Sequence, residues 1–167
     1  MEKVAVTCIE MLNQRGYQIT HSDTEKIIGI REDGTQICVF IVNTPKFNIS
    51  LVEEYIVLMN EIGINHSILV YKNTITPFAK KVLSSCDSMT IELFLEDELQ
   101  YNITKHRLVP LHEKLDDTEA VEFKKTYGTK FPIILKTDPI ARFYGYNRGD
   151  IIKIMRKDSY ITYRIVK

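Results

Sequence analysis

The sequence predicts an α+β protein with two parts, an α/β layer followed by a smaller α+β unit that ends in a β-hairpin. Three observations support this division. Helical and strand-like patterns alternate up to about residue 100. Two strand-like runs with a very short connection close the chain. Residues 1–104 carry 8 Lys and Arg against 14 Asp and Glu, whereas residues 105–167 carry 14 against 8, so the charge changes sign. We place the domain boundary between residues 103 and 104.

The first elements follow from local spacing. Val4, Cys8 and Met11 recur at helical intervals, and Gly16 ends this helix because glycine accepts the left-handed conformation found after helices. Two β-rich runs, residues 27–31 and 36–42, then flank the turn Glu-Asp-Gly-Thr. Asp-Gly supplies the backbone freedom of a tight turn, so we expect a hairpin.

A second helix is expected up to Gly63, with Ser50 as its N-cap and Glu53 completing a capping box. Residues 66–71 and 89–95 are strand-like runs. Between them, Thr76 and Pro77 have the residue types of an N-cap and a first helical position, and this predicts a short helix that ends near Ser84. Alternating strands and helices predict an α/β layer.

The second part begins with a helix over residues 117–127, followed by a short strand over 133–136 and a short helix over 139–144. Residues 150–157 and 160–167 form the closing hairpin, with Asp158 and Ser159 as its connection. In its last strand, apolar and polar residues alternate from Ile161 to Ile165. This alternation predicts one buried and one exposed face.

Composition favours an ordinary intracellular, soluble protein. Net charge is zero and 44% of residues are hydrophobic. The three cysteines, Cys8, Cys38 and Cys86, are odd in number and widely spaced, which is not typical of a disulfide framework or a metal knuckle. The first residues contain too short an apolar run for a signal peptide, and no run of 18 apolar residues occurs.

Four segments carry a resemblance to a known family: HRLVPLHEKL (106–115), KTYG (125–128), PIILKTDPIARFYGYNRGDIIKIMRK (132–157) and YITYRIVK (160–167). They resemble the assembly domain of the fifth subunit of eukaryotic nuclear RNA polymerases, which archaeal polymerases share. MLNQRGYQIT (11–20) and LVYKNTITPFAKKVL (69–83) resemble the N-terminal jaw domain, which the archaeal proteins lack. Residues 1–103 therefore correspond to the jaw, whose fold is similar to restriction endonucleases, and residues 104–167 to the assembly domain.

The resemblance implies a non-catalytic subunit of a DNA-directed RNA polymerase that works in transcription without a cofactor. Its partners would be the largest subunit, other subunits and downstream DNA, with no membrane involved. The chain is shortened in three places relative to the family, as expected of a divergent and virus-encoded relative. The expected location is the nucleus, or a cytoplasmic viral factory and the virion if a virus encodes the chain.

The stretch DPIARFYGYNRGD (138–150) raises the question of binding site or scaffold, and it contains no serine, cysteine or histidine to act as nucleophile or base. Asp138 suits an N-cap, Pro139 a first helical position, and Gly145 and Gly149 suit turns. In the family this domain docks on the largest subunit, which implies a docking surface. The docking candidates are Asp138, Pro139, Arg142, Tyr144, Gly145, Arg148, Gly149 and Arg164. The alternative, that Arg142 only pairs with a carboxylate of its own domain, remains open.

The predicted DNA-proximal site surrounds the short helix that begins at Thr76 and Pro77. A helix N-terminus beside lysines suits a phosphate group, and Lys72, Lys80 and Lys81 supply them. A matching Thr-Pro in the family lies beside downstream DNA, although Phe78 here replaces a small polar residue. Because residues 1–104 are acidic, any contact must be local, weak and independent of base sequence.

Two other functions remain open. A nuclease of the restriction-enzyme type needs a carboxylate and then Glu-x-Lys on the next strand to hold Mg²⁺; Asp33 supplies the first, but Gln36 and Cys38 stand where the others are needed. A free-standing adaptor that borrows the docking domain is the other. His106, His112 and Glu113 lack the spacing of a zinc protease. The basic residues of the closing hairpin could contact nucleic acid, but the family resemblance implies protein docking instead.

Overall fold

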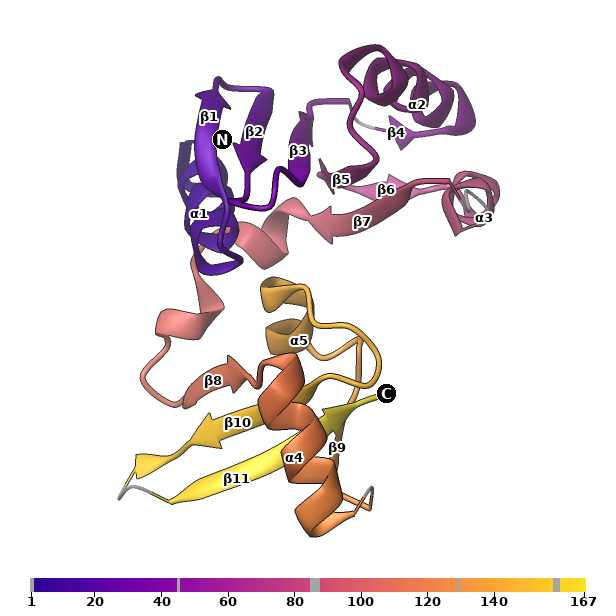
Figure 1. Ribbon diagram of the computed structural model, residues 1–167. Coiled ribbons are helices and arrows are strands. Elements are labelled where there is room, and N and C mark those ends of the chain that lie inside the picture. Colours follow the sequence, from indigo (N-terminus) through magenta and orange to yellow (C-terminus); the bar gives the residue numbers. More distant parts are fainter. Residues whose placement is uncertain (1, 45, 85–87, 129, 158–159) are drawn as a thin grey trace. The chain divides into compact units, whose positions relative to one another are not determined.

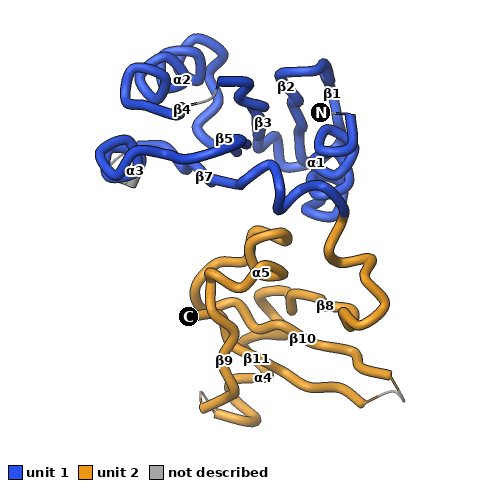
Figure 2. The backbone as a smooth tube through the Cα atoms, turned by 180° about the vertical axis from the view of Figure 1, so that it is seen from behind, with its two compact units in different colours: residues 1–101 blue, residues 102–167 orange. Residues whose placement is uncertain are grey.

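The computed structural model describes residues 2–44, 46–84, 88–128, 130–157 and 160–167. The chain divides into two compact units, Met1–Tyr101 (unit 1) and Asn102–Lys167 (unit 2), coloured blue and orange in Figure 2. Both units mix helices with a sheet, so the predicted α+β class is confirmed. Cys86 and the hairpin connection at Asp158 and Ser159 lie outside the described residues.

Unit 1 is built on a five-stranded sheet of order β1-β2-β3-β5-β7, in which β1, β2 and β3 are antiparallel and β3, β5 and β7 are parallel (Figure 1). A separate parallel pair, β4 and β6, joins two of its loops. Its elements in chain order are α1 (Glu2–Gln14), β1 (Gln18–Ser22), β2 (Lys26–Ile30), β3 (Gln36–Val42), β4 (Lys46–Phe47), α2 (Ile49–Ile62), β5 (His66–Tyr71), β6 (Thr74–Ile75), α3 (Pro77–Ser84), β7 (Thr90–Leu95) and the 3-10 helix η1 (Glu96–Leu99).

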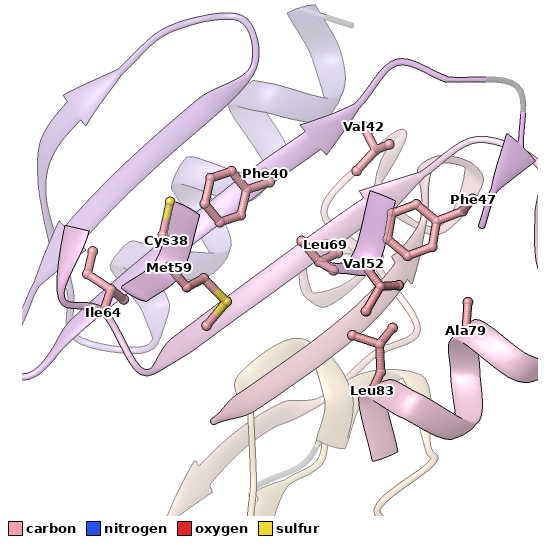
Figure 3. Close-up of a cluster of buried hydrophobic side chains, with 10 residues drawn as sticks. All are labelled: Cys38, Phe40, Val42, Phe47, Val52, Met59, Ile64, Leu69, Ala79 and Leu83. Atoms are coloured by element: carbon pink, nitrogen blue, oxygen red, sulfur yellow. The ribbon is translucent and has the colours of Figure 1, made fainter. Parts of the chain in front are cut away.

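The core of unit 1 lies between the sheet and the helices α2 and α3. Figure 3 shows Phe40 and Leu69 of the strands facing Val52 and Met59 of α2 and Leu83 of α3. All five are buried. On the other face, α1 buries Val4, Cys8, Met11 and Leu12, the stripe that predicted it.

Two expectations for unit 1 need correction. The second helix begins at Ile49, and its N-cap is Asn48, whose side chain accepts a hydrogen bond from Leu51 N at 3.1 Å. Ser50 is therefore inside the helix, and the predicted capping box is wrong. Strand β1 was not expected, because its residues are almost all exposed and so carry no apolar alternation. The hairpin of β2 and β3 is confirmed: Gly34 has φ +82° and Asp33 Oδ1 accepts from Thr35 N at 2.8 Å.

Unit 2 has a four-stranded sheet of order β8-β10-β11-β9, in which β10 and β11 form the expected antiparallel hairpin. Strand β8, which was not expected, pairs antiparallel with β10, and β9 pairs parallel with β11. Its elements are the 3-10 helix η2 (Ile103–Lys105), β8 (Leu111–Lys114), α4 (Asp117–Tyr127), β9 (Ile133–Ile134), α5 (Pro139–Tyr144), β10 (Ile151–Met155) and β11 (Ile161–Val166).

Strand β11 does not have the predicted buried and exposed faces. Ile161 is exposed, and residues 162–165 are all half-buried. The reason is that both faces are partly covered. On one face Tyr163 packs against Phe123 of α4, with ring centroids 4.3 Å apart. On the other face Val166 joins Ile152 and Ala141 in the core.

Candidate functional site

Helix α5 starts and ends where local chemistry predicts. Asp138 Oδ1 accepts a hydrogen bond from Ile140 N at 2.9 Å, and Pro139 occupies the first turn, where no N–H is needed. The helix stops at Gly145, which has φ +67°, a left-handed conformation that a side chain would strain. Its N–H donates to Arg142 O at 3.0 Å. The first half of the stretch 138–150 is thus a short helix with both ends capped.

The second half, residues 145–150, is tied to the end of the sheet. Asn147 N donates to Asp150 Oδ2 at 2.7 Å, and Gly149 N donates to Val166 O at 2.9 Å. Val166 N returns a hydrogen bond to Asp150 O at 2.9 Å, and Lys114 Nζ lies 3.0 Å from Asp150 Oδ1. We call residues 138–150 the docking turn. Its backbone is held at both ends by hydrogen bonds within unit 2.

Most side chains of the docking turn serve the unit's own packing. Ile140, Ala141 and Phe143 are buried. Tyr144 is half-buried and stacks on Tyr146 with ring centroids 5.2 Å apart and planes 10° apart. The pKa of the Tyr144 phenol is raised by burial, and a hydrogen bond with Thr104 offsets only part of this increase. These residues give the turn its shape.

The predicted docking residues differ in what they present to a partner. Pro139 and Arg148 are exposed, and Arg148 has no hydrogen bond or ion pair with any described residue. Arg142 is half-buried and already engaged. Arg164, on β11, is half-buried, and its Nη1 donates to Ile133 O at 3.2 Å. Arg148 is therefore the charged group of this set that is available for a partner.

The start of α3 is also held in place. Thr76 Oγ1 accepts a hydrogen bond from Ala79 N at 3.3 Å, which makes Thr76 the N-cap that the sequence predicted. Thr76 N donates to Phe47 O at 3.1 Å, continuing the β4–β6 pair, and Lys80 N donates to Thr76 O at 3.0 Å. Pro77 is the first helical residue. The N-terminus of α3 is fixed to the rest of unit 1 by backbone hydrogen bonds.

The lysines near α3 are not equivalent. Lys80 and Lys81 are exposed on the helix, next to Phe78, which is 62% exposed. Lys72 donates from Nζ to Asn43 Oδ1 at 3.0 Å and lies 3.8 Å from Glu96 Oε2. The carboxylate of Glu96 offsets part of the charge that Lys72 was expected to provide. The predicted cation cluster therefore keeps two exposed ammonium groups, Lys80 and Lys81, and Lys81 is already engaged within the chain.

An ion network that no local sequence pattern predicted joins α1 to the sheet. Arg15 Nη1 and Nη2 donate to the two carboxylate oxygens of Glu92 at 2.7 and 2.8 Å, and His66 Nε2 lies 2.8 Å from Glu92 Oε1. Burial alone would raise the pKa of Glu92, but the hydrogen bond from His66 and the charge of Arg15 lower it to about 2. This network fixes the end of α1 on β5 and β7, and its role is structural.

A second arginine extends this structural network. Arg31 Nε and Nη2 both donate to Arg15 O, at 3.0 and 2.8 Å. Its guanidinium lies 4.2 Å from the centroid of the Tyr17 ring, within the range of a cation–π contact. The carbonyl at the end of α1 is thereby satisfied, as the last carbonyls of a helix require.

The positions considered for a nuclease site, Asp33, Gln36 and Cys38, do not form a catalytic group in the structure. Asp33 Oδ1 caps its own turn, Gln36 is exposed, and Cys38 is buried in the core, where burial raises the pKa of its thiol to about 12. His112 is buried and its Nδ1 bonds Pro110 O at 2.8 Å. Within the described ranges, no group of three or more His, Cys, Asp and Glu side chains could hold a metal ion. Among the helices described, none has the length and apolar character to cross a membrane.

Comparisons with known proteins find relatives that align over nearly the whole chain. The family model of the RNA polymerase Rpb5 C-terminal domain matches residues 101–166. The subunit "rpabc1" of DNA-directed RNA polymerases I, II and III from Dictyostelium discoideum is 35% identical, over 98% of this chain and 95% of its own length. A provisionally named DNA-directed RNA polymerase subunit of Invertebrate iridescent virus 6 is 36% identical, with 95% of each chain covered.

A plant relative and one solved structure complete the comparison. The DNA-directed RNA polymerase subunit 5-like protein 1 of Arabidopsis thaliana is 33% identical over 97% of this chain and 93% of its own length. A repair endonuclease from Pyrococcus abyssi superposes with a TM-score of 0.41 and 18% identity, over 57% of this chain and 46% of its own. That structural likeness is too small to support an argument about function.

Proposed function

This chain belongs to the family of RNA polymerase subunit Rpb5, and from this membership we propose that it is a non-catalytic subunit of a multisubunit DNA-directed RNA polymerase. The observation that carries the proposal is the 35% identity to an RNA polymerase subunit over 98% of the chain. The catalytic centre then lies in other subunits. The enzyme works in the nucleus or, if a virus encodes the chain, in a cytoplasmic viral factory and the virion.

Unit 2 is the assembly domain and docks on the largest polymerase subunit through the docking turn and the β10–β11 hairpin. The rigid backbone of the turn supports this assignment, because a surface that is ordered before binding loses little conformational entropy when it binds. Arg148 is the best anchor, since its guanidinium is exposed and can form paired hydrogen bonds with a carboxylate. Asp138, Gly145 and Gly149 shape the turn rather than contact the partner.

Unit 1 is the jaw, and α3 lies near downstream DNA. The fixed N-terminus of α3 and the exposed Lys80 and Lys81 support this assignment, because the positive end of a helix dipole and ammonium groups both suit a phosphate. The contact is weak and independent of base sequence. It steers the duplex, while the assembly itself depends on unit 2.

Copurification separates this function from its main rival. A tagged chain should copurify with the polymerase at one copy per enzyme and should stay bound at high salt. A free-standing adaptor would be recovered in substoichiometric amounts and would dissociate as salt rises. Recovery of the chain without any polymerase subunit would contradict the proposal.

A further inference from the structure

A groove of about 500 Å³ lies on unit 1 between the β1–β2 turn and helix α2. Figure 1 shows these two elements on either side of β3. One wall is the turn, residues 23–26, and the other is α2; Phe40 of β3 forms part of the lining. Nothing in the docking or DNA-proximal surfaces uses this groove, because no residue is shared between them.

The α2 wall presents one stripe of the helix to the groove. Glu54, Leu58 and Ile62 are four residues apart, so they lie on one face of α2. The stripe spans about 12 Å, or two helical turns. Leu58 is half-buried and Ile62 is 37% exposed, so this wall carries apolar surface that the fold leaves partly open to solvent.

Aromatic rings and carboxylates both line the groove. The rings of Phe40 and Tyr55 lie 4.9 Å apart and are tilted by 49°. Glu25, Glu54 and Tyr55 line the same groove. Burial raises the pKa of the Tyr55 phenol, and the carboxylates of Glu54 and Glu25 raise it further. Asp23 also lines the groove, but its oxygens are occupied by two turn N–H groups and His21.

The charge of the groove indicates what can occupy it. Glu25 and Glu54 are exposed and form no ion pair with another described residue, while Lys26 is the one basic residue in the described lining of the groove. Helix α2 contains three glutamates, Glu53, Glu54 and Glu61, and no lysine or arginine. An aromatic ring beside two carboxylates suits a guanidinium, which can lie against the ring and bond the acids.

We propose that this groove binds a short basic amphipathic segment of another protein. An arginine of that segment lies between Glu25 and Glu54, over the Tyr55 ring. Apolar side chains one and two turns further along contact Leu58 and Ile62. The proposal goes beyond the polymerase assembly described above, and its failure would leave the assignments of the docking turn and α3 unchanged.

A designed peptide tests the groove directly. The probe is a fluorescein-labelled 12-residue helical peptide with arginine at position 2 and leucine at positions 6 and 10, a spacing that mirrors the stripe of α2. Its fluorescence anisotropy is measured with the full chain. Saturable binding is expected, and the double variant Glu25→Gln/Glu54→Gln should weaken it roughly tenfold, because the guanidinium loses both carboxylate partners.

A matched control separates the groove from general acidity. Glu53→Gln/Glu61→Gln removes the same charge from α2 outside the groove lining and should change affinity less than about twofold, the size of a screened surface effect. A peptide with glutamate at position 2 should bind the Glu25→Arg/Glu54→Arg variant better than the original chain. Circular dichroism of each variant verifies that the fold is retained.

Three results would overturn the proposal. One is the absence of saturable binding. Another is an equal loss of affinity in the two glutamine double variants, which would mean that only net charge attracts the peptide. The third is a concentration-dependent dimer that Glu25→Gln/Glu54→Gln dissolves in sedimentation, because a second copy of this chain would then be the occupant.

Discussion

The docking turn of unit 2 and helix α3 of unit 1 are both short helical segments, yet they hold their charged groups differently. The turn fixes its backbone with hydrogen bonds to β11 and at least half-buries most of its side chains, whereas Arg148 is exposed on this rigid frame. Helix α3 has a fixed start, and it carries the exposed Lys80 and Lys81, of which Lys81 is already engaged within the chain. A rigid frame suits a permanent interface, whereas exposed lysines suit a weak contact that salt can release.

The largest expected effects come from substitutions in the hydrophobic cores of the two units, which support the docking turn and α3. Ile152→Ala removes a fully buried side chain of unit 2, and Leu69→Ala does the same in unit 1. Each should lower the free energy of unfolding of its own unit by about 2–5 kcal/mol. Limited trypsin digestion checks this: Ile152→Ala should leave a resistant fragment of unit 1 only, and Leu69→Ala a fragment of unit 2 only.

This pair also tests the proposed domain division. Lys105 and Arg107 are exposed trypsin sites just after the start of unit 2. If either substitution makes the whole chain sensitive to trypsin, the two units unfold as one, and the comparison between a docking unit and a jaw unit fails.

Charge reversal in the docking turn comes next in size. Arg142→Glu/Arg148→Glu should leave the isolated chain folded but prevent its incorporation into the polymerase, because a like charge or an unpaired charge at an interface costs about 2–5 kcal/mol. Arg148→Glu alone should produce most of the effect, since Arg148 is exposed and Arg142 is already engaged. Subunit stoichiometry after purification is the measurement.

The control for the single variant Arg148→Glu is Lys125→Glu on the exposed side of α4, which makes the same charge change in unit 2 away from the turn. It should assemble normally. Normal assembly of the double arginine variant would show that the docking turn is not the interface.

The ion network of unit 1 predicts a pH effect on the stability of that unit. Because the pKa of Glu92 in the folded chain is about 2 against an ordinary 4.5, its ionised form stabilises the fold above pH 4.5. That contribution should be lost as pH falls from 4.5 toward 2. Glu92→Gln should lower the free energy of unfolding by about 2–3 kcal/mol near pH 7, since it leaves Arg15 without its anion.

Denaturant unfolding at a series of pH values gives the comparison. The difference between the original chain and Glu92→Gln should shrink below pH 4.5 and approach zero near pH 2. A difference that stays constant over this range would mean that the carboxylate's charge does not stabilise unit 1.

Short-range signals explain which parts of the fold could be predicted from the sequence. Asp138, Pro139 and Gly145 lie within a few residues of the backbone groups they serve, so α5 could be placed with its correct ends. Ser50 misled because Asn48, two residues earlier, offers a competing cap. Arg15 and Glu92 are 77 residues apart, and only the sheet and α1 bring them together. No local sequence pattern predicts an ion pair between residues so far apart in the chain.

The smallest expected effect belongs to the lysines of α3. Lys80→Glu/Lys81→Glu should leave assembly intact, because both side chains are exposed and lie outside the core. The polymerase should hold downstream duplex less firmly at low salt, and the defect should shrink as salt rises, since counterions displace phosphate contacts. If each lysine contacts one phosphate, the plot of log affinity against log salt concentration should become less steep, its negative slope decreasing in magnitude by about 2. Lys3→Glu, an exposed reversal on α1, is the control for either single reversal, Lys80→Glu or Lys81→Glu, and should leave the slope unchanged. A variant that fails to assemble, or one that assembles and keeps the original slope, would remove α3 from the DNA-proximal surface and leave unit 1 without an assigned contact to DNA.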